Sequence, residues 1–235
     1  MISVDAHSHI LPGIDDGSHS SEQSLAMLAE AAKQGVTHVV ATPHFYARHS
    51  DPDTFLAKRA VAALTLERAM AGRTDLPKVI LGAEVHYFSG IGESEHISRL
   101  TIGDTRLILI EMPSPPWTEA MYRDLENIRI FQGLTPIIAH VERYIRPFRT
   151  YGIPRRLEQL PVLVQANAEF FLNPATAAMA LRMLRKGQIH LLGSDCHNLT
   201  DRAPNLGHAR RVVAQKLGRT ALSEVHKFEA ILCGE

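Results

Sequence analysis

Seven short apolar runs, each followed by a side chain that can bind a metal or a phosphate, constrain the fold of this chain more than any other feature. Segments with helical patterning separate the runs, so strand and helix are expected to alternate. If the runs are parallel strands, their carboxyl ends meet at one edge, where the active sites of strand–helix barrels lie. The runs and the residues that follow them are 2–6 with His7 and His9, 36–42 with His44, 79–83 with Glu84, 107–110 with Glu111, 136–139 with His140, 162–166 with Asn167, and 189–194 with Asp195 and His197. This order predicts an α/β fold with one polar site.

The segments between the runs carry the apolar spacing of helices. Ser20 and Gln23 form a candidate capping box, and Leu25 and Leu28 begin an i, i+3, i+4, i+7 pattern that Gly35 ends. Further helices are predicted over 54–70, 119–131, 176–185, 208–217 and 220–232. Seven strands are one fewer than the common barrel has, so we predict a distorted (β/α)7 barrel, with a doubly wound open sheet as the alternative.

Composition fits a single compact domain over residues 1–235. The chain is 45% hydrophobic and carries 25 Lys and Arg against 25 Asp and Glu, so no charge bias favours nucleic acid or an anionic membrane. The sequence begins without a basic segment followed by a long apolar core, and no run approaches the roughly 20 apolar residues that cross a bilayer. Cys196 and Cys233 are too few for a disulfide scaffold. We therefore expect a cytoplasmic protein without membrane insertion.

The first run ends in an HxH pair. Side chains alternate along an extended strand, so His7 and His9 point the same way and can bind one metal. A turn-rich loop with the adjacent carboxylates Asp15 and Asp16 follows, and one of them could be a ligand while the other orients a neighbour. The pair alone is also compatible with two hydrogen-bonded histidines at a strand end, and the loop with a simple turn.

Charged groups at the ends of the other runs strengthen the metal hypothesis. A carboxylate in a partly buried site is costly unless it is paired or metal-bound, so Glu84, Glu111 and Asp195 beside several imidazoles suggest cations between them. Each residue taken singly could equally be a helix N-cap or part of a salt bridge. Their repetition at equivalent positions favours a multinuclear metallohydrolase. Among the remaining histidines, His86 is the one that we single out as an additional site residue.

Six short motifs lie at the ends of the apolar runs. They are DAHSHILPGIDDGS at 5–18, Thr42-Pro43-His44, Gly82-Ala83-Glu84, Ile110-Glu111, IAHVERY at 138–144 and GSDCHN at 193–198. Together they resemble the polymerase and histidinol phosphatase (PHP) superfamily, and within it the bacterial tyrosine-protein phosphatases of capsule and exopolysaccharide systems. The HxH opening is general to the superfamily, whereas IxPGxDDG and IAHxERY resemble this branch. The resemblance extends from residue 1 to about residue 205.

The resemblance implies a distorted (β/α)7 barrel with three divalent metal ions, usually manganese. Iron and zinc also suit such oxygen- and imidazole-rich ligands. The metals would lower the pKa of a bridging water, and the resulting hydroxide would attack phosphorus. The implied ligands are His7, His9, Glu84 and Asp195 for one ion, Glu84, Glu111 and His140 for a second, and Asp16, His44 and His197 for a third. The choice of Asp16 over Asp15 rests on the family pattern alone.

Arg143 and Arg202 correspond to family arginines that hold the substrate phosphate. A guanidinium fork matches phosphate oxygens bidentately. The alternative for Arg143 is a solvated surface pair with Glu142. Loops bearing Tyr46, Tyr87, Phe88 and Trp117 are candidates to frame an aromatic substrate ring, although core packing is the commoner use of such residues.

One competing motif is Cys196 with Arg202, which has the Cys-x5-Arg spacing of thiolate-dependent tyrosine phosphatases. We interpret this spacing as accidental. The loop has no glycine to let its backbone approach phosphate, Asp201 would repel the dianion, and Pro204 removes a nearby donor. Strand alternation would also turn Cys196 away from its neighbours Asp195 and His197.

The sequence hypothesis is therefore metal-dependent hydrolysis of phosphotyrosine on a protein, with a bacterial tyrosine kinase of polysaccharide export as the partner that the resemblance implies. Two alternatives stay open. One is a small-molecule phosphatase of the histidinol-phosphatase type, because the same metal core serves both reactions. The other is a regulatory PHP protein without turnover, although no proposed ligand is replaced by an inert residue.

Overall fold

All strands in the described part of the chain are parallel, and they run in two hydrogen-bonded groups. The computed structural model describes residues 2–145 and 152–235. One group has the order β1-β2-β4 and the other has the order β3-β5-β6-β7-β8-β9. The strands are β1 (Val4–Ser8), β2 (His38–Ala41), β3 (His44–Phe45), β4 (Lys78–Leu81), β5 (Glu84–His86), β6 (Leu107–Glu111), β7 (Thr135–Ile138), β8 (Leu163–Asn167) and β9 (Leu191–Gly193).

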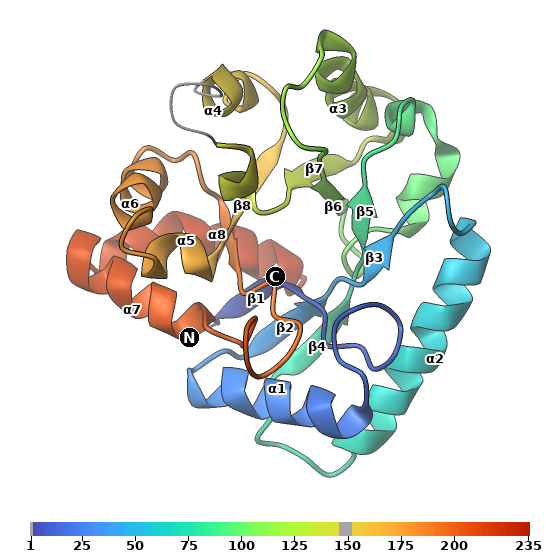
Figure 1. The fold of residues 1–235 in the computed structure, drawn as a ribbon, viewed down its shortest axis with the longest axis vertical. Coiled ribbons are helices and arrows are strands. Elements are labelled where there is room, and N and C mark those ends of the chain that lie inside the picture. The colour runs from blue at the N-terminus through green and yellow to red at the C-terminus, as the bar shows by residue number, and fades with distance from the viewer. Residues whose placement is uncertain (1, 146–151) are drawn as a thin grey trace.

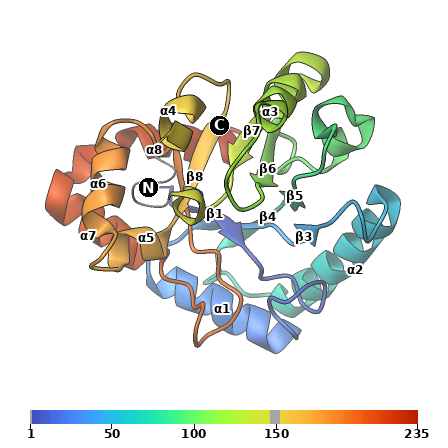
Figure 2. The same ribbon diagram turned by 45° about the horizontal axis from the view of Figure 1, so that its top comes forward.

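Backbone hydrogen bonds join the two groups into one curled sheet, which Figure 1 shows with the helices outside it. Just beyond β9, the Asp195 amide donates to the His7 carbonyl at 2.8 Å, and the His9 amide donates to the Cys196 carbonyl at 2.9 Å. On the other side, β2 is followed at once by β3, and β4 by β5. The sheet therefore bends as a half-barrel, and its carboxyl ends lie at one face of the molecule (Figure 2).

Two of the expected strands are each divided in two, which corrects the runs predicted over 36–42 and 79–83. Pro43 has no amide hydrogen and interrupts the ladder after β2, while Gly82-Ala83 separates β4 from β5. The Glu84 amide then donates to the Pro43 carbonyl at 3.0 Å. His44 and Glu84 consequently begin new short strands that pair with each other in register, instead of following strand ends.

The helices follow the predicted pattern, with small shifts at their ends. Ser20 caps the first helix by accepting from the Gln23 amide at 3.3 Å, whereas the Gln23 side chain accepts from the His19 amide, one residue earlier than a capping box requires. Among the described residues, the sequence did not predict α4, α5 or the 3₁₀ segments over 91–93, 95–99 and 141–144. The helix predicted over 220–232 is correct from residue 223, and 219–222 form a 3₁₀ segment before it. The helices are α1 (Ser21–Lys33), α2 (Pro52–Met70), α3 (Glu119–Gln132), α4 (Gly152–Leu157), α5 (Ala168–Leu172), α6 (Ala177–Arg185), α7 (Leu206–Leu217) and α8 (Ser223–Leu232), with 3₁₀ segments Ile91–Glu93, Glu95–Arg99, Val141–Tyr144 and Arg219–Leu222.

Both faces of the sheet are buried, as strands covered by helices require. Along β6, Leu107 and Leu109 belong to a small apolar cluster with Leu232 of α8, while Ile108 and Ile110 belong to the large cluster. This alternation follows the two-residue period of a strand. Within the described parts of the chain, no helix combines the length and the apolar character that a membrane crossing needs. The core thus holds the strand ends rigidly, and the polar site is built on them.

Candidate metal centre

The nine side chains predicted as metal ligands converge at the carboxyl ends of the strands. His7, His9 and His140 are at most 1% exposed, as is Glu84, and Asp195 and His197 are also buried. His44 and Glu111 are half-buried, and the side chain of Asp16 is 67% exposed. The site therefore has a buried base of imidazoles and carboxylates and a more open rim.

The HxH pair faces two carboxylates, as strand alternation predicted. The Nε2 atoms of His7 and His9 are 3.2 Å apart. They lie 3.2 and 3.3 Å from Glu84 Oε2, and 3.5 and 3.4 Å from Asp195 Oδ1. Four ligand atoms thus surround one small volume, and His7, His9 and Asp195 form one of the groups able to hold a cation.

The two oxygens of Glu84 point to different neighbours. Its Oε1 lies 2.8 Å from His140 Nε2, which is also 3.6 Å from Glu111 Oε1. Its Oε2 lies 3.0 Å from His44 Nδ1, and His44, Glu84 and Glu111 form a second candidate group. The two oxygens of Glu84 would therefore be available to two neighbouring ions, and His44 as well as His140 lies beside this carboxylate.

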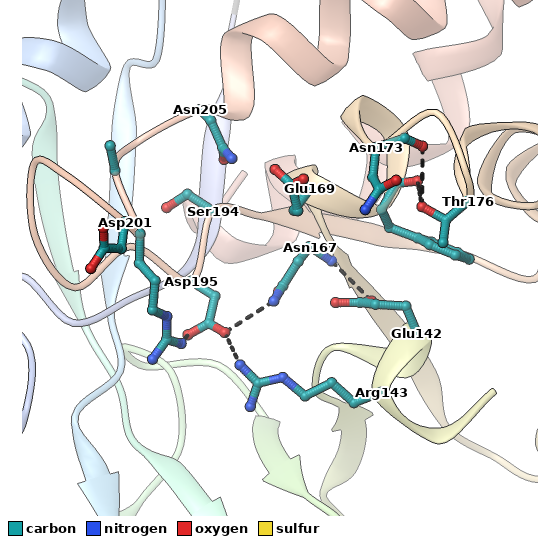
Figure 3. A pocket seen from close by; sticks show the side chains of 13 residues that line it. Glu142, Arg143, Asn167, Glu169, Asn173, Thr176, Ser194, Asp195, Asp201 and Asn205 are labelled. Atoms are coloured by element: carbon teal, nitrogen blue, oxygen red, sulfur yellow. Dashed lines mark hydrogen bonds and ion pairs between the residues drawn. The ribbon is translucent and has the colours of Figure 1, made fainter. Parts of the chain in front are cut away.

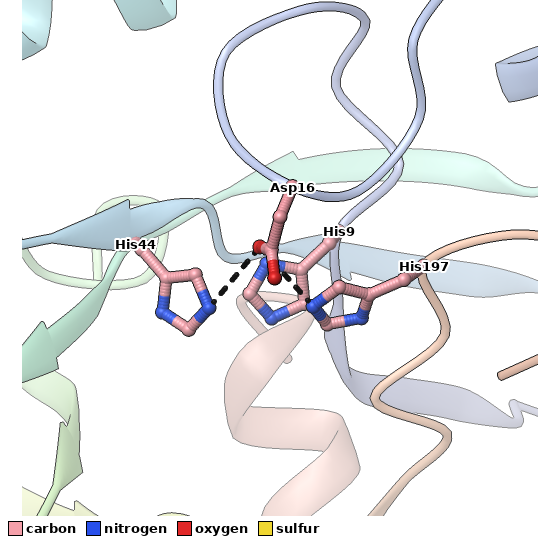
Figure 4. A group of neighbouring side chains, drawn as sticks. All are labelled: His9, Asp16, His44 and His197. Carbon is pink, nitrogen blue, oxygen red and sulfur yellow. Dashed lines mark ion pairs between the residues drawn. The ribbon is translucent and has the colours of Figure 1, made fainter.

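A third group gathers His9, Asp16, His44 and His197 (Figure 4). The Asp16 Oδ1 atom lies 3.4 Å from His44 Nε2 and 3.5 Å from His197 Nε2. The rings of His9 and His197 lie in contact, tilted by 34°, with centroids 3.9 Å apart. This group contains all three ligands predicted for the third ion, with His9 in addition.

The adjacent carboxylates of the 11–18 loop occupy different places. Asp15 Oδ2 lies 2.8 Å from His9 Nδ1 and accepts from the His44 amide at 3.1 Å, and Asp15 Oδ1 accepts from the Gly17 amide at 3.0 Å. Burial opposes ionisation of Asp15, but the hydrogen bond and charge of His9 outweigh it and lower the pKa of Asp15 to about 2. Asp15 orients His9 from behind, whereas Asp16 faces the cluster.

The buried amides of Gln165 and Asn167 link three of the candidate ligands. Gln165 Oε1 accepts from the His140 amide at 2.6 Å and lies 3.3 Å from His7 Nδ1. Gln165 Nε2 donates to Asn167 Oδ1 at 3.0 Å, and Asn167 Nδ2 donates to Asp195 Oδ2 at 3.0 Å. The sequence predicted Asn167 as a strand-end residue but did not single out Gln165. The two lie two residues apart on β8, so their side chains are on the same face of the strand.

The polar atoms of the site fit divalent cations. His44 Nδ1, Glu84 Oε2 and His197 Nε2 are buried without a well-formed hydrogen bond, and such orphaned groups are costly unless an ion satisfies them. Burial, together with the charges of His9 and Arg202, lowers the pKa of His197 to about 4, which keeps a nitrogen lone pair available. Burial opposes ionisation of Glu84, but the surrounding imidazoles, His7 foremost, hold the pKa of Glu84 well below its usual range.

Both predicted arginines lie at the edge of the cluster and pair with the same carboxylate. Arg143 Nη2 donates to Asp195 Oδ2 at 2.6 Å, and Arg202 Nη2 lies 2.7 Å from Asp195 Oδ1. A cavity of about 380 Å³ opens beside them, with Glu142, Asn167 and Asp195 on its wall (Figure 3). The alternative pairing of Arg143 with Glu142 is not found among the described residues: the Glu142 carboxylate accepts from the Asn167 amide at 3.2 Å.

The Cys-x5-Arg alternative finds no support in the geometry. Cys196 is 2% exposed, and its amide donates to Ser194 Oγ at 3.2 Å. Burial and the nearby carboxylates of Asp5 and Asp195 raise the pKa of the Cys196 thiol. A thiol that is buried and protonated is a poor nucleophile.

The aromatic residues singled out in the sequence divide between two roles. Tyr46, Tyr87 and Phe88 line one cavity, whereas Trp117 packs in the core with its ring centroid 4.9 Å from that of Tyr144. His86 lines the same cavity as the first three, and its Nδ1 lies 3.0 Å from Glu111 Oε2.

A curled parallel sheet with clustered imidazoles and carboxylates at its carboxyl ends defines an α/β protein with a candidate multinuclear metal centre. The chain belongs to the family described as capsular polysaccharide synthesis, CpsB/CapC, whose sequence model matches residues 3–230.

Named relatives and a solved structure agree with this family. The chain is 29% identical over 232 residues to the tyrosine-protein phosphatase CpsB of Streptococcus pneumoniae, covering 94% of each chain. It is 31% identical over 227 residues to the tyrosine-protein phosphatase YwqE of Bacillus subtilis, covering 92% of this chain and 85% of the relative. A crystal structure from work on YwqE and CpsB, described as metal-dependent tyrosine phosphatases, matches with a TM-score of 0.84 and 26% identity over 98% of this chain and 94% of that chain.

Proposed function

We propose that this chain is a metal-dependent protein-tyrosine phosphatase that hydrolyses the phosphomonoester of phosphotyrosyl proteins. The observation that carries the proposal is the clustering of eight imidazole and carboxylate side chains in three overlapping groups, with His140 2.8 Å from Glu84 beside them. Relatives that cover nearly the whole chain are named as tyrosine-protein phosphatases, and the similar solved structure is described as metal-dependent. The reaction class and the substrate class both follow from this combination.

The proposed centre holds three divalent ions, with manganese the preferred metal and iron or zinc compatible with the same ligands. When bound, such ions supply Lewis acidity toward water and toward the phosphoryl oxygens. The Glu84 carboxylate, placed between two groups, would serve both of them, and Asp16 rather than Asp15 would complete the third. The proposed ligands are His7, His9, Glu84 and Asp195, then Glu84, Glu111 and His140, and finally Asp16, His44 and His197.

The two arginines are proposed to hold the substrate phosphate. Their guanidinium groups each contact one carboxylate oxygen of Asp195. A phosphate bound beside Asp195 could therefore accept hydrogen bonds from both guanidinium groups. Asn167 holds Asp195 from the other side. Arg143 and Arg202 are thus directed toward the cluster before substrate binds, which lowers the entropic cost of phosphate capture.

The biological setting is also a proposal. The family is described by capsular polysaccharide synthesis, and the relative in Staphylococcus aureus is named a putative tyrosine-protein phosphatase CapC. We infer that this chain acts in the cytoplasm on a tyrosine kinase of polysaccharide export. A kinase that is itself phosphorylated on tyrosine would supply the substrate for such a phosphatase.

We also propose that the curled sheet is a distorted (β/α)7 barrel and that residues 1–235 form one domain. If β2 with β3 and β4 with β5 are each counted as one broken strand, seven strands follow one another around the sheet. The hydrogen bonds between the ends of β1 and β9 support closure of the ring.

The proposed reaction is tested with three substrates and the manganese-loaded protein. Phosphate release is measured from a phosphotyrosyl peptide, from the matched phosphoseryl peptide and from histidinol phosphate. We expect the phosphotyrosyl peptide to give the highest kcat/KM. The Glu84→Gln variant, which keeps the shape of the side chain but loses its charge, should lose at least a hundredfold in activity.

The other outcomes separate the alternatives left open by the sequence. Preference for histidinol phosphate would assign the protein to the small-molecule phosphatases. No release from any substrate, with manganese bound, would favour a regulatory protein without turnover.

A further inference from the structure

A second cavity, of about 630 Å³, adjoins the candidate metal centre, and neither Arg143 nor Arg202 lines it. We call it the aromatic cavity, and it is lined by Tyr46, Arg48, His49, His86, Tyr87 and Phe88 among others. Two contacts join it to the centre. His86 Nδ1 lies 3.0 Å from the candidate ligand Glu111, and the Tyr46 ring lies 5.3 Å, centroid to centroid, from the ring of the candidate ligand His44.

The walls of the aromatic cavity are held in place by contacts within the protein. The Tyr46 ring packs between His49 and His86, with centroid separations of 5.7 and 5.3 Å. Tyr87 Oη donates to Asp124 Oδ2 of α3 at 2.6 Å, and the Gly90 amide lies 3.2 Å from the same oxygen. The surface is therefore preorganised, and binding there does not first require these rings to be ordered.

The aromatic cavity and the cavity beside the arginines differ in charge. Among the described residues that line the aromatic cavity, none carries a carboxylate, while Arg48 adds a positive charge. Arg48 is exposed and takes part in no ion pair with the described part of the chain. By contrast, Glu142, Glu169 and Asp201 line the cavity beside the arginines. Electrostatic complementarity therefore directs an acidic segment of a substrate toward the aromatic cavity.

We propose that the aromatic cavity binds the polypeptide segment flanking the phosphotyrosine and selects a segment with an acidic side chain. The proposal rests on the proposed phosphatase function. The volume of the aromatic cavity falls within the range of ligand-binding sites. Arg48 follows Tyr46, whose ring lies beside the candidate ligand His44, by two residues. Because an extended peptide advances about 3.3 Å per residue, we take the three residues on either side of the phosphotyrosine as the segment that the cavity would contact. The apolar parts of that segment would lie on Tyr46 and Phe88.

The proposal is tested with phosphotyrosyl peptides of one length that differ only in the three residues on each side of the phosphotyrosine. In the first series, the three residues on the amino side are all Glu, all Gln or all Lys. In the second series, the three residues on the carboxyl side are varied in the same way. With the manganese-loaded protein, we expect kcat/KM to be at least tenfold higher for Glu than for Lys on one of the two sides. The preference should weaken at high salt, because exposed charges are screened.

Charge reversal at Arg48 supplies the second arm of the test. Arg48→Glu should reverse the preference, so that the Lys peptide becomes the better substrate on that same side. Arg211→Glu, an exposed position on α7, makes the same change in net charge away from the cavity and should leave the preference as it was.

The outcomes distinguish this proposal from the function on which it rests. Equal kcat/KM for all peptides, with no effect of Arg48→Glu, would overturn the role of the aromatic cavity while the phosphatase function stood. Hydrolysis of no phosphotyrosyl peptide would overturn the proposed function and this proposal with it.

Discussion

Gln165 shows how a single uncharged side chain can organise a metal centre. Its carbonyl oxygen contacts both the His140 amide and His7 Nδ1. Its amide nitrogen donates to Asn167, and Asn167 in turn donates to Asp195. A hydrogen bond at Nδ1 fixes the ring orientation and leaves Nε2 of His7 facing the carboxylates. Groups that hold ligands in this way are as important for affinity as the ligands' own chemistry.

Replacing Gln165 should therefore weaken metal binding without unfolding the protein. Gln165→Met keeps the volume but removes the hydrogen bonds to His140, His7 and Asn167. Loss of such a partner typically costs about ten- to hundredfold in metal affinity. The affinity for manganese is measured by competition with a chelator, and circular dichroism checks the fold. Gln215→Met, at an exposed position of α7, is the control. An unchanged affinity in Gln165→Met would contradict the role assigned to this amide.

The buried thiol of Cys196 is not expected to take part in the reaction. Because its thiol is buried and protonated, Cys196→Ser should retain most of its phosphatase activity. A polar hydroxyl in that place should lower the free energy of unfolding by about 1–2 kcal/mol, measured by urea denaturation. Complete loss of activity in a folded, metal-loaded variant would instead support a mechanism in which the Cys196 thiolate is the nucleophile.

Strained backbone marks two of the candidate ligands. Outside glycine, positive φ angles are found in the described residues at His140, with φ of 33°, and at Asp195, with φ of 54°. Such conformations are unfavourable for residues with a side chain and persist where the surrounding structure enforces them. Here the turns after β7 and β9 carry the ligands into the cluster.

At the scale of elements, the loop after β1 depends on one glycine. A Cβ added to Gly17 would lie 2.2 Å from the His9 carbonyl oxygen and 2.4 Å from His9 Cβ, so the loop would have to move. Asp15 and Asp16 would move with it, and the orientation of His9 would be lost.

Gly17→Ala should consequently reduce the amount of manganese bound and the activity together. We expect the number of ions per chain, measured by elemental analysis, to fall, and the free energy of unfolding to fall by about 1–3 kcal/mol. Gly152→Ala is a suitable control, since nothing lies within 4 Å of the added Cβ. Equal metal content in the two variants would show that the loop does not require Gly17.

The strand order and the polar strand ends were predictable from the sequence, and some local detail was not. Buried runs of four or more residues, such as β6 and β7, carry enough pattern to be recognised, and their ends identify Glu111 and His140. The two-residue strand β3 and the three-residue strand β5 are too short to show the two-residue alternation of a strand in the sequence. The separation of Asp15 from Asp16 and the role of Gln165 depend on contacts between distant segments, which a single sequence does not record.

At the scale of the whole molecule, the candidate metal centre lies where the chain leaving β1 meets the chain leaving β9. Asp195 and His7 are linked by a backbone hydrogen bond as well as by their side chains. Divalent ions at this junction would bind only the folded chain, and a ligand of that kind stabilises the fold by mass action.

Removal of metal should accordingly lower the thermal stability. At a metal concentration a hundred times the dissociation constant, one site contributes about 2.7 kcal/mol, which corresponds to a rise in Tm of about 5–10 °C for a chain of this size. Calorimetry of the protein with manganese and after chelation measures the difference. The same Tm in both samples would contradict a structural coupling between the ions and the fold.

We propose that these clustered side chains bind divalent ions and that the bound ions are required for phosphotyrosine hydrolysis. A titration of metal-stripped protein with manganese tests both parts, because bound ions per chain and phosphate release from a phosphotyrosyl peptide are measured in the same samples. We expect no release from the stripped protein and full activity as the third ion binds. Undiminished release from metal-stripped protein, or full loading without any release, would contradict this mechanism.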